Sequence, residues 1–450
     1  MKSIFYITLI FNMFTSEAYS IPKLDLLKSR PIDKKIFNLA KPATLNYVMG
    51  PIVGMVDTLW VSKLGSSHEL AGAGSGDQIF SIFYVITSFL PAIITPKITE
   101  LYIKNKQKET NELITTSLLL TNILGIITTM FIFTYSDFVI YLFIDKTSLI
   151  SNYANNYFKY RSLGICFALT NSLIFSILRG FMDFNDAIKI NFKSQMMNAI
   201  LNPVFMKYYG LKGIAIASVL SDIYCSINYI KLLISKNRYC TKITNFFNNS
   251  KELLKQGSFI QIKNVLTHLT YLYINKKILF IDNTGVLLAS HIILIKFLEL
   301  CSISFFGLYS VSNILIPSEK NLHNDKEAKE RLLLWSVVIG VIQSVLLFNS
   351  KFLLPYLTSD LRVIETCKNV INIISLYQII NGYSTVLEGI LQGYQKFKHS
   401  GIANVISIIP MIGLISISNN LHNLWSAGII AITIKCIYIQ YFINVQKNEN

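Results

Sequence analysis

Residues 42–61 read PATLNYVMGPIVGMVDTLWV, and this stretch decides the class of fold. It lies between Lys41 and Lys63, and Asp57 is its only charged residue. A helix needs about 20 apolar residues to cross about 30 Å of hydrocarbon, because each residue advances about 1.5 Å. The stretch therefore predicts a transmembrane helix that carries one carboxyl group.

Apolar blocks of similar length recur along the whole chain and predict about twelve transmembrane helices. Six lie at roughly 37–62, 77–100, 112–134, 155–178, 188–208 and 210–234, and six at roughly 252–280, 285–316, 331–350, 368–392, 400–419 and 424–445. Of the 450 residues, 52% are hydrophobic and 15% are charged. This hydrophobic fraction is higher, and the charged fraction lower, than in a typical soluble chain. We therefore expect an all-α polytopic membrane protein.

The two halves of the chain look like an internal duplication. Residues 177–184 read ILRGFMDF, and residues 390–397, which lie 213 positions later, read ILQGYQKF. Six helices are an even number, so both halves start on the same side of the bilayer, and an axis along the membrane normal should relate them. We expect two six-helix lobes, 36–234 and 252–445, joined by a loop at 235–251.

The amino terminus has the composition of a targeting leader. Residues 1–20 contain Lys2, an apolar run and the small residues of Ala18-Tyr19-Ser20, which predict a cleaved signal peptide. Residues 21–35 are basic and resemble a transit segment, as in the two-part leaders of plastids that protists acquired secondarily. The alternative is a basic tail that precedes the first helix.

The formal net charge of +16 is explained best by membrane topology. About 25 Lys and Arg fall in the amino-terminal flank and after even-numbered helices, against about 10 after odd-numbered helices. Both termini should therefore face the cytosol or a plastid stroma. Because the cations form no stripe with aromatic neighbours, we expect no nucleic-acid partner.

Asp57 is the clearest candidate for a functional residue. A charged side chain at the centre of a membrane helix costs at least about 2.5–3.5 kcal/mol on insertion scales. Desolvation penalises only the ionised form of a carboxyl group, so Asp57 could exchange a proton during transport. Alternatively, it caps a helix break or pairs with a lysine. Gly50, Pro51 and Gly54 predict either a hinge beside it or close helix packing.

Several motifs follow one another along the chain: Pro42, Val56-Asp57-Thr58, Leu64-Gly65, Glu69-Leu70-Ala71, Leu178-Arg179-Gly180 with Asp183, Asn198, Asn202-Pro203, residues 213–217, and Leu387-Glu388-Gly389 through Gly393. In this order they resemble the MATE family, most closely its DinF-like branch. The likeness runs from about residue 33 to 445. It implies a transporter with two six-helix lobes around a central cleft.

The resemblance also implies an ion-coupling set of Asp57, Asn198, Asn202 and Glu388. Asp57 matches the acidic residue that the family links to cation or proton coupling, and Asn198 matches a polar partner. Asn202 stands where members with a proton-binding amino-terminal lobe have Asp, which puts a two-carboxylate relay in doubt because Asn cannot titrate. Glu388, seven residues after Asn381, would be the ionisable group of the second lobe, or else a carboxylate near the headgroups.

Three further residues are candidates for lining the substrate cleft. Lys263 and His268 make the seventh predicted helix unusually polar, and Asn381 stands where some family members carry an acid. The unperturbed pKa of His, about 6.5, suits a proton carrier. The alternative for His268 is a hydrogen-bonded structural residue.

The expected function is secondary active antiport: export of an organic solute, a drug-like cation or an organic anion, coupled to influx of H⁺ or Na⁺. The chain has no G-x-x-x-x-G-K-[ST] loop, and we expect no cofactor and no structural metal. We expect a monomer in the bilayer of a protist plastid envelope or, otherwise, of a plasma membrane or endomembrane. Alternatives are a lipid-linked oligosaccharide flippase of related fold and a non-transporting derivative. An enzyme is disfavoured because the histidines form no recognisable motif.

Overall fold

The computed structural model describes residues 28–144, 146, 148–239, 246–282, 284–320, 324–358 and 360–445. The predicted signal peptide at 1–20 lies outside this part, as do residues 21–27 of the predicted transit-like segment. Residues 31–35 of that segment already belong to the first described helix. All regular secondary structure in the described ranges is helical, as expected for an all-α protein.

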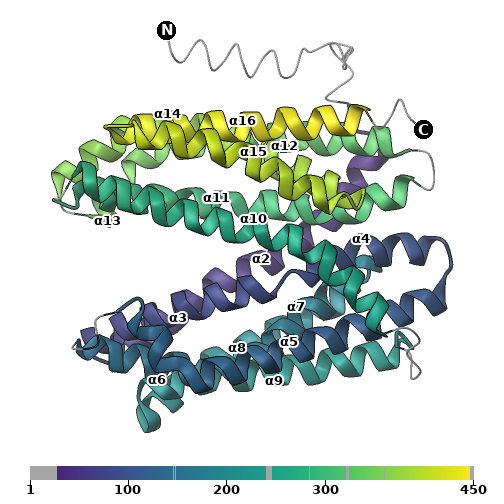
Figure 1. Ribbon diagram of the computed structural model, residues 1–450, viewed down its shortest axis with the longest axis horizontal. Coiled ribbons are helices and arrows are strands. Elements are labelled where there is room, and N and C mark those ends of the chain that lie inside the picture. Colours follow the sequence, from purple (N-terminus) through teal and green to yellow (C-terminus); the bar gives the residue numbers. More distant parts are fainter. Residues whose placement is uncertain are drawn as a thin grey trace. The chain divides into compact units, whose positions relative to one another are not determined.

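The helices follow one another along the chain with short connections (Figure 1). The first half holds α2 (Pro31–Leu64), α3 (Ser67–Thr87), α4 (Leu90–Ile103), α5 (Gln107–Tyr141), α6 (Leu149–Ser162), α7 (Ile165–Gly180), α8 (Asn185–Tyr209) and α9 (Leu211–Ser235). The second half holds α10 (Phe246–Ile281), α11 (Val286–Lys320), α12 (Asp325–Asn349), the 3₁₀ turn η2 (Ser350–Phe352), α13 (Leu354–Leu357), α14 (Leu361–Gly393), α15 (Phe397–Ser416) and α16 (Leu421–Val445).

The described helices account for the twelve predicted spans. Eight are long and apolar enough to cross a membrane, and α6 with α7, which meet at a bend of 51°, make a ninth. The other three long helices, α2, α8 and α10, carry charged side chains that lower their mean hydropathy. The prediction of an all-α polytopic protein with about twelve transmembrane helices is confirmed.

The backbone contacts divide the chain into two units, each described here by itself. The N-terminal unit is Pro42–Asn264, and the C-terminal unit comprises the chain up to Lys41 together with the chain from Val265 onward. The first turns of α2 therefore pack with the C-terminal unit, and the start of α10 packs with the N-terminal unit. The predicted lobe limits, 36–234 and 252–445, stay a prediction.

In the N-terminal unit, α7 packs against α4, α5 and α9, while α3 packs against α6 and α8 against α9. An apolar cluster that includes Phe80, Phe158 and Leu169 joins α3, α6 and α7. The start of α10 is fixed to this unit by an ion pair of 2.8 Å between Lys97 and Glu252. These contacts fix the positions of α3, α6, α7, α8 and α9 within the unit.

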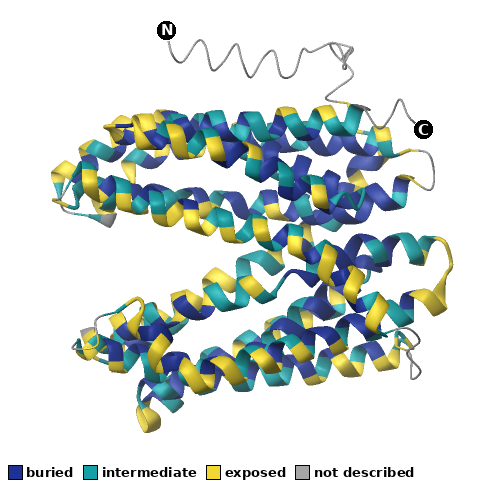
Figure 2. Cartoon of the chain, in the orientation of Figure 1, coloured by how far each residue is buried: buried dark blue, intermediate teal, exposed yellow. Residues whose placement is uncertain are grey.

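In the C-terminal unit, α14 is the central helix and packs against α11, α12 and α16. Most of its residues beyond Val363 are buried, as Figure 2 shows for the interior faces of this bundle. The first turns of α2 add Ile32, Ile36 and Ala40 to the same apolar core. The carboxylate of Asp33 anchors them, since Arg331 of α12 donates to both of its oxygens over 2.7 and 2.6 Å.

Two local sequence signals fix the helix ends near the predicted site. Ser66 and Glu69 form a capping box, in which the Glu69 amide donates to the Ser66 hydroxyl and the Ser66 amide donates to the Glu69 carboxylate. Gly210 separates α8 from α9 with a φ of 61°, a conformation that glycine adopts without steric cost. The sharp turn lets α8 and α9 run side by side.

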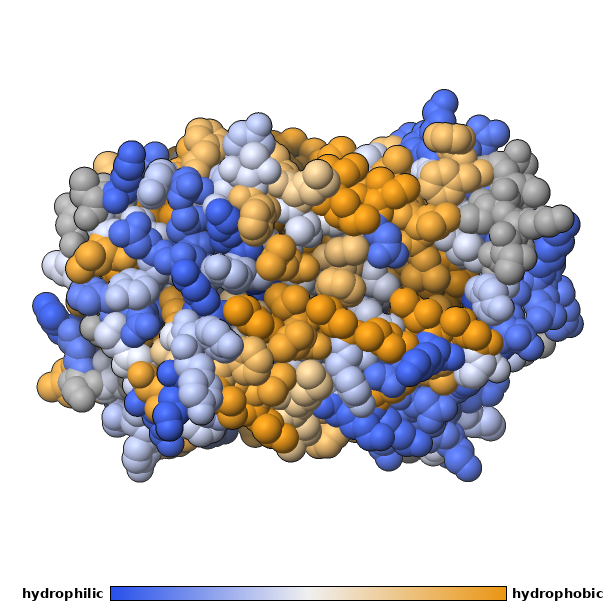
Figure 3. All heavy atoms as spheres, turned by 90° about the horizontal axis from the view of Figure 1, so that it is seen from below, coloured by the Kyte–Doolittle hydropathy of each residue, from blue (hydrophilic) through white to orange (hydrophobic). Residues whose placement is uncertain are grey.

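Apolar side chains also cover the outside of the helices. On the face shown in Figure 3 they form a broad central band, and hydrophilic side chains gather toward both ends. Helix α5 is one example: it exposes four apolar side chains, one above another at helical spacing, namely Leu119, Ile123, Ile126 and Met130. Exposed apolar area of this kind fits contact with lipid.

Candidate functional site

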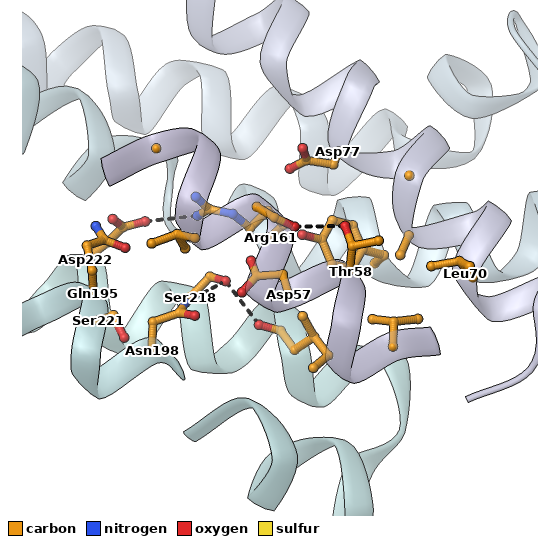
Figure 4. Close-up of a pocket in the computed structure, with 18 residues that line it drawn as sticks. Asp57, Thr58, Leu70, Asp77, Arg161, Gln195, Asn198, Ser218, Ser221 and Asp222 are labelled. Atoms are coloured by element: carbon orange, nitrogen blue, oxygen red, sulfur yellow. Dashed lines mark hydrogen bonds and ion pairs between the residues drawn. The ribbon is translucent and has the colours of Figure 1, made fainter. Parts of the chain in front are cut away.

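The candidate site lies in the N-terminal unit, where Asp57 on α2 faces a cavity of about 520 Å³ (Figure 4). Its side chain is half-buried. Gly54 and Gly50, one and two turns earlier, also line the cavity, and nothing lies within 4 Å of a Cβ added at either position. Close helix packing is therefore not the role of these two glycines. They leave open space beside the carboxylate.

A row of buried amides holds Asp57 from one side. The Asn202 amide donates from its Nδ2 to Asp57 Oδ1 over 2.5 Å and to Asn198 Oδ1 over 2.7 Å. Asn198 in turn donates to the Ser218 hydroxyl over 3.0 Å, and Ser218 donates to the Ile214 carbonyl. The structure thus brings three of the four predicted ion-coupling residues, Asp57, Asn198 and Asn202, into one hydrogen-bonded row.

The amide oxygen of Asn202 differs from the other polar atoms of this row because it accepts no hydrogen bond from the described residues. The residue is fully buried, and its Oδ1 has no hydrogen-bond partner among the described residues. A buried amide oxygen without a donor is costly unless a ligand or an ordered water satisfies it. The unsatisfied oxygen thus belongs to the side chain whose amide nitrogen contacts Asp57.

Three further charged residues line the same cavity and were missed by the sequence reasoning: Asp77 on α3, Arg161 on α6 and Asp222 on α9. Each lies within a predicted apolar block. Asp77 is the only charged residue between Glu69 and Lys97. The criterion that singled out Asp57, a lone charge in a long apolar stretch, would have found Asp77 and Asp222 as well.

Arg161 and Asp222 form an ion pair across the cavity wall. The guanidinium donates to Asp222 Oδ2 over 2.9 Å and lies 4.3 Å from the centroid of the Phe80 ring. Asn171 donates to the Asp222 carbonyl and accepts from Ser226, which fixes α7 against α9 at this level. The positive charge of Arg161 is thus held at one carboxylate of the three (Figure 4).

Glu388, the fourth predicted coupling residue, lies in the C-terminal unit and is buried, with 5% of its surface exposed. Lys435 of α16 donates to its Oε2 over 2.5 Å, and Ser400 and Gln392 donate to its Oε1 over 3.0 and 3.2 Å. Both carboxylate oxygens are therefore satisfied by protein donors. Its role in ion coupling stays a prediction.

The three predicted cleft residues belong to different units. Asn381 donates to Ser302 over 3.2 Å and to Gln378 over 3.3 Å, inside the C-terminal unit. Lys263 is half-buried at the end of the α10 segment that belongs to the N-terminal unit, whereas His268 is exposed on the segment that belongs to the other unit. None of the three is among the residues that line the Asp57 cavity, and their predicted roles stay predictions.

Comparison with known proteins identifies the relatives of this chain. The MatE family model matches residues 42–204 and 283–415. The chain is 24% identical over 407 residues to "Probable multidrug resistance protein NorM" of Thermotoga maritima, covering 84% of this chain and 83% of the relative. It is 23% identical over 399 residues to "Protein DETOXIFICATION 44, chloroplastic" of Arabidopsis thaliana, covering 83% and 74%. A solved transporter of the MOP superfamily from Pyrococcus furiosus has the same fold, with a TM-score of 0.80, 17% identity and coverage of 95% and 98%.

Proposed function

We infer the function of this chain from one premise: it belongs to the MatE family, the family that its motifs resemble. It is an integral multi-pass membrane protein of a multidrug efflux transporter family. We propose that it exports an organic solute, a drug-like cation or an organic anion, in exchange for H⁺ or Na⁺. Assignment to the DinF-like branch stays a prediction.

The observation that carries the proposal is the position of Asp57. It is a carboxylate in an apolar transmembrane helix, it faces a cavity, and one of its oxygens is held by the buried Asn202 amide. A carboxylate in such a place is costly when ionised and unpaired, which is the usual mark of an ion or proton site in a membrane protein. We expect the coupling ion to bind at Asp57.

The surrounding groups suit either ion. A proton would bind the Asp57 oxygen that Asn202 does not contact, and the hydrogen bond from Asn202 would persist. A sodium ion would find oxygen ligands in the Asp57 carboxylate and in the unsatisfied Asn202 Oδ1. In both cases the negative charge of Asp57 is neutralised, and the relative stability of the states open to the two sides changes.

The energy available is adequate for export without a nucleotide. For one-for-one exchange of a monocation, no net charge crosses the membrane, and a tenfold ion gradient, worth about 1.4 kcal/mol, supports about a tenfold solute ratio. For a solute whose exchange moves one net charge, a potential of 100 mV adds about 2.3 kcal/mol. Alternating access then requires only that ion and solute bind the two states with different affinities.

The test is gradient-driven transport in proteoliposomes. Wild type, Asp57→Asn and the control Asp137→Asn, an exposed aspartate on α5, are compared with fluorescent cations and anions under a pH or Na⁺ gradient. We expect Asp57→Asn to abolish flux and Asp137→Asn to leave it intact. The gradient that drives flux identifies the ion. Unchanged flux in a folded Asp57→Asn variant would contradict the proposal.

We propose a plastid envelope as the membrane in which the protein acts, with plasma membrane or endomembrane as the alternative. The support is the basic leader and the chloroplastic designation of the Arabidopsis relative. Residues 1–35 fused to a fluorescent protein should co-localise with a plastid marker in a plastid-bearing cell. Retention in the secretory pathway would contradict this location.

A further inference from the structure

Asp77 is the carboxylate of the cavity that the coupling scheme leaves unused. It projects from α3 into the cavity, and its side chain is exposed there. Within the described part of the chain it accepts no hydrogen bond and forms no ion pair. Asp57, by contrast, is held by Asn202, and Asp222 is held by Arg161.

The charges of the cavity do not cancel. Asp57, Asp77 and Asp222 together carry three negative charges when ionised, and Arg161 carries the only opposing charge among the residues that line the cavity. Arg161 is held at Asp222 over 2.9 Å. A coupling ion at Asp57 would neutralise a second carboxylate, so one negative charge would remain, at Asp77.

These carboxylates do not converge on one ion. Among the described residues no group of three or more His, Cys, Asp or Glu side chains is placed to hold a metal ion. A volume of about 520 Å³ is far more than one ion needs and falls in the range of pockets for organic molecules. Val53, Val61, Leu70 and Ile214 give part of the wall an apolar character, and Tyr157 adds an aromatic ring. The lining thus combines apolar surface with one unpaired carboxylate.

We propose that Asp77 binds the positive charge of the transported solute and so determines that this cavity prefers organic cations to organic anions. The inference rests on the proposed export function and assigns one residue to its substrate specificity. The solute's apolar part would lie against the aliphatic wall and Tyr157, and its cationic group would lie against Asp77.

This arrangement also couples the two ligands electrostatically. Asp57 and Asp77 face one cavity, so a cation bound at either carboxylate is also attracted by the negative charge of the other. A proton or Na⁺ at Asp57 removes one of the two charges and weakens the hold of Asp77 on the solute. By reciprocity, a cationic solute at Asp77 weakens ion binding at Asp57. Such mutual weakening is what an exchanger requires.

The experiment measures binding to the purified full-length protein in nanodiscs. The probes are a rhodamine monocation and fluorescein, which share a xanthene ring system and have opposite charges. We compare wild type with Asp77→Asn, Asp77→Glu and the control Asp137→Asn. Asp77→Asn should weaken rhodamine binding about tenfold or more without weakening fluorescein binding, Asp77→Glu should restore most of the affinity, and Asp137→Asn should resemble wild type.

The opposing results are distinct. Unchanged rhodamine affinity in Asp77→Asn would overturn the proposal, and so would an equal loss for both probes, since that would indicate damage to the cavity rather than loss of a charge. Failure of this inference leaves the transport proposal standing if Asp57→Asn still abolishes gradient-driven flux. If Asp57→Asn transports normally, the coupling proposal fails whatever Asp77 does.

Discussion

Replacing Asp33 with alanine should strongly lower the free energy of unfolding. Asp33 lies 24 residues before Asp57 and is not part of the candidate site. Arg331 donates hydrogen bonds to both oxygens of the Asp33 carboxylate over 2.7 and 2.6 Å, and Trp335 Nε1 donates to Oδ1 over 2.8 Å. The Arg331 and Asp33 side chains are only 2% and 4% exposed. Removing the carboxylate would leave a buried guanidinium without its counter-charge, which costs about 3–5 kcal/mol.

The assay is SDS-titrated unfolding in mixed micelles, which gives the free energy of unfolding. The matched control is Glu299→Ala, because the Lys296–Glu299 pair is 71% and 58% exposed and should contribute less than about 1 kcal/mol. The double variant Asp33→Ala/Arg331→Met should recover most of the loss, since no buried charge remains in this pair. A loss for Asp33→Ala no larger than that of the control, or a double variant as unstable as the single one, would refute this reasoning.

Three further changes test the packing and charge of other sites. Gly213→Ala should destabilise by about 1–3 kcal/mol, because its Cβ would lie 2.1 Å from the Phe205 carbonyl oxygen. Thermal unfolding in detergent would show a shift, and a melting temperature equal to wild type would contradict the prediction. Glu388→Gln should also destabilise, by up to about 3 kcal/mol, because it removes the buried counter-charge of Lys435, whose side chain is only 14% exposed. Loss of ion dependence with full stability would instead favour ion coupling at Glu388. Burial opposes ionisation of Asp183, but Lys236 and Arg238 beside it lower its pKa, so the stability it contributes is present above about pH 4 and lost as pH falls further. Asp183→Asn should therefore cost up to about 1 kcal/mol at pH 7. In melting curves the difference from wild type should shrink as the pH falls below about 4, and a gap that keeps its full size in acid would contradict the pairing.

The order and number of the helices could be predicted from the sequence because hydrocarbon imposes a length on every span. The block around Asp57 and the repeat of residues 177–184 at 390–397 required no tertiary information. Bends are harder to predict, because they depend on local packing. The fourth span, expected from about residue 155, begins at Leu149 and bends by 51° where α6 meets α7.

The candidate site was predicted in part. Asn198 and Asn202 lie four residues apart on α8, so helical periodicity already places them on one face. That this face meets Asp57 follows only from the packing of α8 against α2, which the hydrogen bond of 2.5 Å from Asn202 to Asp57 reports.

What the sequence by itself determined is therefore the class of fold, the internal repeat and a lone carboxylate in the first span, since each depends on the composition of a short stretch. Only the tertiary structure decided which charges share the cavity. Three different helices contribute Asp77, Arg161 and Asp222. Arg161 forms its ion pair with Asp222, over 2.9 Å. The physical reason is that an ion pair between helices depends on their rotation and depth in the bundle, and these are set by the packing of all their side chains together.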